Sequence, residues 1–443
     1  MNKKQVAFLS VISLSLSLPL IPATATVKAG AKCTKTGTKS VAGNKTFTCV
    51  KSGKKLVWNK GVSKSTATKS TPVPVPVPAE FASSRTSDPA LFLDDKPCRI
   101  IDGDPVTTHM TAGFPIPNGR IDMKKGANIQ VIGVDFIDKK AGNGSPQDQN
   151  KYISSATEKF WVSQSTVPVK INWKWHPDWV TMPNPIKSYN MGGSFFEGKF
   201  NPGIYFQFAR NIISQTDEKI DFNSINLLII LFPKGIQNDE IGTFVVHTQD
   251  TYFTNEGGIN NLIMAGGDYA TVETYIHEFG HALGLTDIRD TTNLGNQKSD
   301  GMYFDTMNNQ NYPELLVWHR FLLGFLEPTQ IHCLSDSNES THWLHPVAKN
   351  TKELKGLVIP LNSTEAIIVE SRRAINYDEK LKSRSDLIGA VVYTLDSKVP
   401  YRRTPVRVVR VLKNQESVLS NGYKISVIES GDFGDVVKVE KVS

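Results

Sequence analysis

The segment TVETYIHEFGHALGL, residues 271–285, constrains the fold of this 443-residue chain more than any other stretch. Its apolar residues recur with the period of an α-helix, and Gly284 is a stop signal near its end. On such a helix His277 and His281 lie one turn apart and face the same way. The chain must therefore bury one side of this helix in a core and still keep two imidazoles together.

The residue types at this spacing are those of a metal site. Two neutral imidazoles one turn apart can hold Zn²⁺, and Glu278 beside them can accept a proton from water. Gly284 permits a sharp reversal after the helix, which places Asp287 to return as a third ligand in the pattern HExxHxxGxxD. Asp290 is the alternative third ligand. A structural helix with satisfied core histidines is the weaker interpretation once this continuation is included.

This pattern resembles the metzincin clan of zinc peptidases, in which the third ligand is usually His. The Asp variant is similar to snapalysin and especially to the immune inhibitor A type of bacterial secreted metallopeptidase. FDTMN, with Met307, looks like the Met-turn beneath the zinc, and PELLVWHRFLLGFLEP, residues 313–328, looks like the helix that follows it. The resemblance spans residues 125–400 and is specific only within 275–328. It implies one catalytic zinc and a protein or peptide substrate.

The sequence departs from the metzincin pattern at one position. The Met-turn of that clan often carries a Tyr two residues after Met, and here that position is Asn309. This departure leaves the Met-turn without the tyrosine that would help to stabilise the oxyanion, and Tyr303 and Tyr312 are the nearby substitutes.

Two further expectations concern the surroundings of this helix. By resemblance, TFVVHT, residues 243–248, would be the sheet edge along which an extended peptide adds as another strand. Asp300 and Asp305 are candidates for a calcium site, although surface acids beside a loop are the commoner explanation.

The first residues indicate export. Two lysines precede an apolar run over residues 6–21, and small residues follow it, which predicts a signal peptide over residues 1–29. A membrane anchor is the alternative, but serines and a proline break the run, which is shorter than the roughly 20 apolar residues of a span. No later stretch is long and apolar enough to span. We therefore expect a secreted or extracellular protein without a transmembrane segment in its mature form.

The charge of the chain is unevenly distributed. Residues 1–79 contain thirteen lysines and no Asp or Glu, so the remainder has 37 basic and 43 acidic residues, a net charge of −6. Residues 30–61 are typical of a small lysine-rich β module stapled by a disulfide, and residues 62–79 of an extended Pro/Val/Ser/Thr linker. The lysines favour binding to an anionic cell-wall polymer at the cell surface. The alternative is that they only form a solvated face of the protein. No nucleic-acid-binding motif accompanies them.

Four cysteines fit an exported protein, in which disulfides persist. Cys33 and Cys49 lie in one short segment, which leaves Cys98 and Cys333 as the second pair. Alternatively, Cys98 is a thiolate that caps the zinc in a latent form, and Cys333 is then a free thiol. Residues 80–125 are short for an independent inhibitory prosegment, so we expect most of them to belong to the catalytic domain.

The rest of the chain predicts an α+β fold. Residues 127–136, 167–175 and 224–232 are strand-like and residues 147–164 form an amphipathic helix, which together predict a metzincin-like catalytic domain with a mixed sheet over residues 80–328. Six short alternating runs then predict a C-terminal β-sandwich over residues 329–443.

The residues and the resemblance together predict a secreted zinc-dependent endopeptidase, with His277, His281 and Asp287 as ligands and Glu278 as general base. The rival prediction is a surface-attached protein that binds cell wall or glycan, in which the peptidase domain is secondary or inactive. That rival predicts degenerate ligands, whereas the histidines and the glutamate of the motif are all intact.

Overall fold

The structure is a computed structural model that describes residues 27–43, 45–63, 86–104, 109–192, 201–237, 239–242, 245–247, 251–265, 270–290, 303–308, 313–400 and 403–442. The expected signal peptide and linker lie almost entirely outside these residues. The chain divides into two compact units, Met1–Pro76 and Val77–Ser443. In the part of the chain that the structure describes, no helix is long and apolar enough to cross a membrane.

The first unit contains a small antiparallel sheet. Strand β2 pairs with β1 and β3 on its two sides and also with β4. A disulfide joins Cys33 to Cys49, and Cys49 is fully buried, so the predicted pairing in this module is confirmed. All nine lysines of residues 27–63 are exposed. The strands are β1 (Lys39–Ala42), β2 (Lys45–Ser52), β3 (Lys55–Trp58) and β4 (Val62–Ser63).

The second unit begins its α/β part with a sheet in the order β6-β5-β8-β12-β9. The first four strands are mutually parallel, and β9 pairs antiparallel with β12 at the end of the sheet. A short hairpin of β10 and β11 precedes β12. The strands are β5 (Ala127–Phe136), β6 (Ile171–Trp175), β7 (Val180–Met182), β8 (Leu227–Leu231), β9 (Val245–His247), β10 (Tyr252–Thr254), β11 (Gly257–Ile259) and β12 (Leu262–Ala265).

Helices cover both faces of this sheet. Every residue of β8 is buried, as expected of a parallel strand with a helix layer on each side. Helices α2 (Pro146–Ser163) and α4 (Val272–Ala282) share one hydrophobic cluster with alternate residues of β5, β8 and β12, and α3 (Pro202–Thr216) packs on the opposite face. The predicted strand 127–136 and helix 147–164 are confirmed, whereas the strand predicted over 167–175 begins only at Ile171.

The C-terminal part consists of two sheets packed face to face. The first has the order β13-β15-β16-β17-β18 and the second β14-β21-β20-β19, and a hydrophobic cluster fills the space between them. The strands are β13 (Ile331–Cys333), β14 (Glu339–Leu344), β15 (Gly356–Pro360), β16 (Glu365–Arg372), β17 (Gly389–Asp396), β18 (Val406–Leu412), β19 (Ser417–Ser420), β20 (Tyr423–Gly431) and β21 (Gly434–Lys441).

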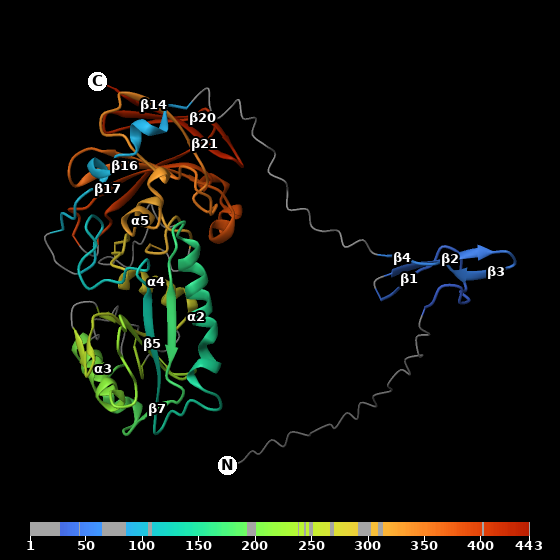
Figure 1. The fold of residues 1–443 in the computed structure, drawn as a ribbon, viewed down its shortest axis with the longest axis horizontal. Helices are drawn as coiled ribbons and strands as arrows, with labels where there is room; N and C mark the ends of the chain where they lie inside the picture. Colours follow the sequence, from blue (N-terminus) through green and yellow to red (C-terminus); the bar gives the residue numbers. More distant parts are fainter. Residues whose placement is uncertain are drawn as a thin grey trace, which may run out of the picture. The chain divides into compact units, whose positions relative to one another are not determined.

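The first of these sheets has a second buried face. Residues of β15, β16 and β17 join the cluster that contains α4 and the short helix α5 (Val317–Leu322). Figure 1 shows α4 and α5 between the sheet of β5 and the strands β16 and β17. One hydrophobic core therefore runs through the position at which we expected two domains to meet.

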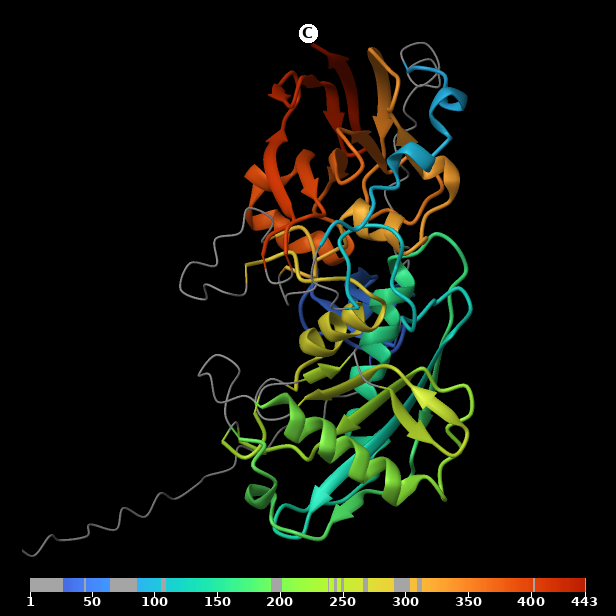
Figure 2. The same cartoon turned by 90° about the vertical axis from the view of Figure 1, so that its left-hand side faces the viewer.

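Residues 86–104 lie against the C-terminal sheets, as Figure 2 shows for the light blue segment. The backbone N–H of Ser87 donates to Thr341 O at 2.8 Å, and that of Ile101 donates to Ser363 O at 2.8 Å. The segment includes the short 3₁₀ turns Pro89–Phe92 and Lys96–Cys98. A disulfide joins Cys98 to Cys333, which confirms the second pairing and makes the zinc-capping thiolate wrong.

Removal of the Cys98–Cys333 bridge should destabilise the second unit strongly, because it closes a loop with a sequence separation of 235 residues. We expect Cys98→Ala/Cys333→Ala to lower the free energy of unfolding by about 2–4 kcal/mol, as measured by urea denaturation. The matched control is Cys33→Ala/Cys49→Ala, which changes the first unit only. A main unfolding transition that shifts equally in both double variants would contradict the expectation.

Candidate metal centre

Local sequence determines where α4 begins and ends. The hydroxyl of Thr271 accepts from the backbone N–H of Thr274 at 3.3 Å and so caps the first turn. Gly284 then adopts φ +104°, a conformation that side chains other than glycine rarely adopt. The N–H of Leu285 returns to Gly280 O at 3.0 Å, so the chain reverses immediately after the helix. This reversal brings the third predicted ligand back toward the histidines.

Both histidines of α4 are buried and held through Nδ1. The His277 Nδ1 lies 2.8 Å from Thr306 O, and the His281 Nδ1 lies 2.8 Å from Leu285 O. A carbonyl oxygen only accepts, so each Nδ1 carries the proton and donates it. In a neutral imidazole the other nitrogen, Nε2, is then an acceptor and is available to a cation.

Asp287 faces the same space as the two Nε2 atoms. Its Oδ1 lies 3.2 Å from Nε2 of His277, and its Oδ2 lies 3.9 Å from Nε2 of His281. The imidazole centroids are 4.9 Å apart, with the rings almost perpendicular. The carboxylate of Asp287 thus lies next to both imidazoles of α4.

Glu278 belongs to the same buried group. Ligand atoms of His277, Glu278 and His281 all lie within 4.8 Å of one another. Among the residues that the structure describes, neither carboxylate oxygen of Glu278 has a hydrogen-bond partner, although both are buried. Burial raises the pKa of this carboxyl group to about 8. A buried carboxylate without donors is expensive unless a cation or a reacting molecule compensates for it.

The ionisable groups of the site strongly affect one another. Burial opposes the charge of Asp287, but the two histidines and Arg289 outweigh it and hold its pKa below the usual range. Burial likewise opposes protonation of His277, yet the hydrogen bond and charge of Asp287 raise its pKa. Burial lowers the pKa of His281 to about 4, which keeps this imidazole neutral. The carboxyl group of Asp287 is therefore ionised beside the neutral imidazole of His281.

Residues 303–308, here called the Met307 turn, lie beneath α4. A Cβ atom added at Gly280 would meet the sulfur of Met307, so the turn packs directly against the helix. Asp305 is fully buried and accepts from the N–H groups of Met307 and Leu316, each at 2.7 Å. Its Oδ2 also lies 2.8 Å from Nδ1 of His319. Sequence reasoning missed this role, although the position of Asp305 two residues before Met307 was a usable signal.

The expectation that Asp305 is a surface acid is wrong, and the predicted role of Tyr303 stays a prediction. Asp305 is neither a surface acid nor exposed to a solvent cation, because backbone N–H groups and a histidine occupy its oxygens. Tyr303 places its ring 4.6 Å from the guanidinium carbon of Arg384. Asp300, Asn309 and Tyr312 lie outside the described residues.

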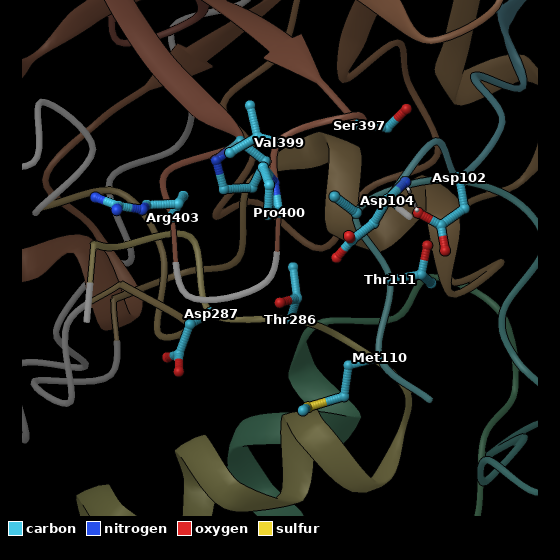
Figure 3. Close-up of a pocket in the computed structure, with 12 residues that line it drawn as sticks. Asp102, Asp104, Met110, Thr111, Thr286, Asp287, Ser397, Val399, Pro400 and Arg403 are labelled. Carbon is cyan, nitrogen blue, oxygen red and sulfur yellow. Dashed lines mark hydrogen bonds between the residues drawn. The ribbon is translucent and has the colours of Figure 1, made fainter. Parts of the chain in front are cut away.

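Asp290 is turned toward the C-terminal sheets. Its Oδ2 accepts from Nη1 of Arg403 at 3.0 Å, which favours Asp287 over Asp290 as the third ligand. Figure 3 shows Arg403 and Pro400 on one side of a small cavity, with Thr286 and Asp287 below them. The volume of this cavity is about 10 Å³, enough for about one water molecule.

These observations meet the requirements of a divalent cation. His277 and His281 offer anchored nitrogen donors, Asp287 offers an oxygen donor, and Glu278 supplies a further buried negative group. Nitrogen and oxygen donors in this combination suit zinc. A single cation at this point would compensate both carboxylates at once.

No protein-family model and no curated protein matches this chain. The chemistry of the site is therefore inferred from its residues and their geometry.

Gly284 lies in the reversal between α4 and Asp287, the predicted third ligand. A side chain at this position should therefore lower both the stability of the protein and its affinity for a divalent cation. We expect Gly284→Ala to lower the free energy of unfolding by about 1–2 kcal/mol because of its φ of +104°. Its Cβ would also lie 3.0 Å from Arg120 and Ile116 side-chain atoms. Urea unfolding and divalent-cation affinity would be measured together.

The control for this substitution is Gly422→Ala. Gly422 also has a positive φ, +79°, but its nearest neighbour is 3.8 Å away and it lies between β19 and β20. It should lose stability without losing cation affinity. An equal loss of affinity in both variants would show that global destabilisation, and not the turn, controls the site.

Proposed function

We propose that this chain is a secreted zinc-dependent endopeptidase. The observation that carries the proposal is the closeness of two Nδ1-anchored imidazoles and the Asp287 carboxylate to the buried carboxylate of Glu278, which has no hydrogen-bond partner among the described residues. His277, His281 and Asp287 would hold one zinc ion, and Glu278 would serve as general base. The resemblance to the immune inhibitor A type of metzincin supports the same assignment.

The sheet beside α4 offers a place for the substrate. Strand β9 is the antiparallel edge strand next to β12, and α4 packs near both strands. An extended peptide can add to such an edge through main-chain hydrogen bonds. We infer that the substrate is a peptide segment in extended conformation, which fits a peptidase that acts within chains.

The chain's own residues perform the proton transfers in the proposed reaction. When bound, zinc would acidify a water molecule and polarise the scissile carbonyl. Glu278 accepts the proton of the attacking water and later donates it to the leaving amine, so that one carboxylate acts as base and then as acid. Thr306 O and Leu285 O keep the two histidines oriented throughout, and no covalent bond to the protein forms.

The rival assignment is a protein that binds cell wall or glycan through its lysine-rich first unit. The two assignments differ in a single measurement, cleavage of a peptide library by the purified protein after zinc addition. Cleavage supports the peptidase, and its absence in a protein that binds zinc would favour the binding protein.

Glu278→Gln should abolish most of the peptide cleavage without releasing the zinc ion. The amide keeps the shape of the side chain but cannot accept the proton, so peptide cleavage should fall about a hundredfold or more. Zinc content after dialysis should stay at one ion per chain, because Glu278 is not assigned as a ligand. Loss of zinc from this variant would make Glu278 a ligand, and normal cleavage would make the mechanism wrong.

Asp287→Ala should lower zinc affinity and activity together, since two imidazoles alone hold the ion poorly. The control is Asp290→Ala, which removes an acid three residues away that pairs with Arg403. Competition with a chelator would measure affinity in both variants. If Asp290→Ala loses zinc while Asp287→Ala retains it, the third ligand is misassigned.

A further inference from the structure

The direction of one predicted ligand depends on a carbonyl outside its own helix. His277 is held by Thr306 O, which belongs to the Met307 turn. Within the turn, Asp305 binds the N–H of Met307 and connects it to Leu316 and His319. Asp305 thus ties the turn to α5 (Val317–Leu322) and to the residue just before it.

A second group that holds the turn comes from the C-terminal sheet. Arg372, the last residue of β16, is fully buried. Its Nη2 donates to Phe304 O at 2.7 Å and to Leu315 O at 3.0 Å, and its Nη1 donates to Glu314 O at 3.2 Å. One guanidinium thus joins the Met307 turn to the segment that enters α5.

Two acidic side chains hold this guanidinium in place. Its Nε donates to Glu370 at 2.5 Å, and its Nη1 lies 2.9 Å from Asp378. The other oxygen of Glu370 accepts from the N–H of Val317 at 2.7 Å and from the hydroxyl of Tyr393 at 2.9 Å. Strands β16 and β17 therefore bind the start of α5 at the same time as the turn.

The chemistry of arginine explains why this position needs a guanidinium. Arginine presents five N–H donors in a rigid plane, whereas lysine presents three on a flexible stem. The donors of Arg372 reach two carboxylates and three carbonyls. A lysine could neutralise the carboxylates but could not also bind the carbonyls on both segments.

We propose that Arg372, supported by Glu370 and Tyr393, positions the Met307 turn and through Thr306 O the imidazole of His277. The C-terminal sheet is then a structural part of the zinc site. These three side chains are positioning residues, since none is assigned a contact with substrate or metal. The inference rests on the proposed function, because it concerns the geometry of the zinc ligands.

The neighbouring residue provides a matched control. Arg373 is also buried and pairs with Asp435 at 2.9 Å, and it donates to Gly431 O and Gly434 O at 2.7 Å each. These partners belong to β20 and β21 of the second sheet, away from the Met307 turn. Arg372→Lys and Arg373→Lys thus both remove buried hydrogen bonds, one at the last residue of β16 and the other at the residue directly after it.

The experiment compares these two variants with the unmodified protein. We expect both to unfold at lower urea concentration. Only Arg372→Lys should bind zinc about tenfold more weakly in chelator competition. This is the typical effect of removing a residue that orients a metal ligand without binding the metal itself. Its Co²⁺-loaded form should also show a changed visible absorption spectrum and a lower kcat. In Arg373→Lys the zinc affinity and the Co²⁺ spectrum should match the unmodified protein.

Tyr393→Phe is the milder test if Arg372→Lys does not fold. It removes one hydroxyl from Glu370 and should change the Co²⁺ spectrum in the same direction. If Arg372→Lys or Tyr393→Phe folds and keeps the Co²⁺ spectrum and zinc affinity of the unmodified protein, the inference is overturned. The same holds if Arg373→Lys changes the spectrum and the affinity as much as Arg372→Lys does. Absence of zinc binding in the unmodified protein would instead overturn the proposed function and this inference with it.

Discussion

The hydrogen bond from His277 Nδ1 to Thr306 O joins a helix to a turn 29 residues farther along the chain. It determines which imidazole nitrogen keeps its proton and in which direction the other one points. The corresponding bond of His281 goes to Leu285 O, four residues away, and is closed by the turn at Gly284. One imidazole is therefore oriented by local sequence, and the other depends on tertiary structure.

The tertiary contribution takes the form of buried charge. Arg372, Glu370, Asp378, Glu314 and Arg320 are all buried between α5 and the C-terminal sheet. Buried ion pairs contribute little net stability, because desolvation offsets most of their attraction. Their value here is geometric. Apolar packing would hold the sheet against α5 as firmly, but it would not select one orientation for the carbonyl of Phe304.

Periodicity and spacing predicted the helices and strands that are determined by residues within their own segment. The helix around residues 147–164 and strand 127–136 follow from apolar patterns, and α4 follows from its cap, its apolar face and Gly284. Residues 365–373, EAIIVESRR, indicate a strand, yet nothing in them tells that Arg372 and Arg373 bind different parts of the unit. Asp305 was misjudged for the same reason, since its partners include residues up to 14 positions later.

The acidic ligand candidate depends on a third part of the chain. Thr111 is buried beside the reversal after α4, where its N–H donates to Gly284 O at 2.8 Å and its carbonyl accepts from the N–H of Thr286 at 3.3 Å. Thr111 follows the segment that Cys98 fastens to the C-terminal sheets. The reversal that presents Asp287 is thus paired with Thr111 through an isolated parallel bridge between Thr111 and Leu285. Helix, sheet and N-terminal segment each orient a different member of the site, so its geometry is a property of the whole second unit, not of the HExxH helix alone.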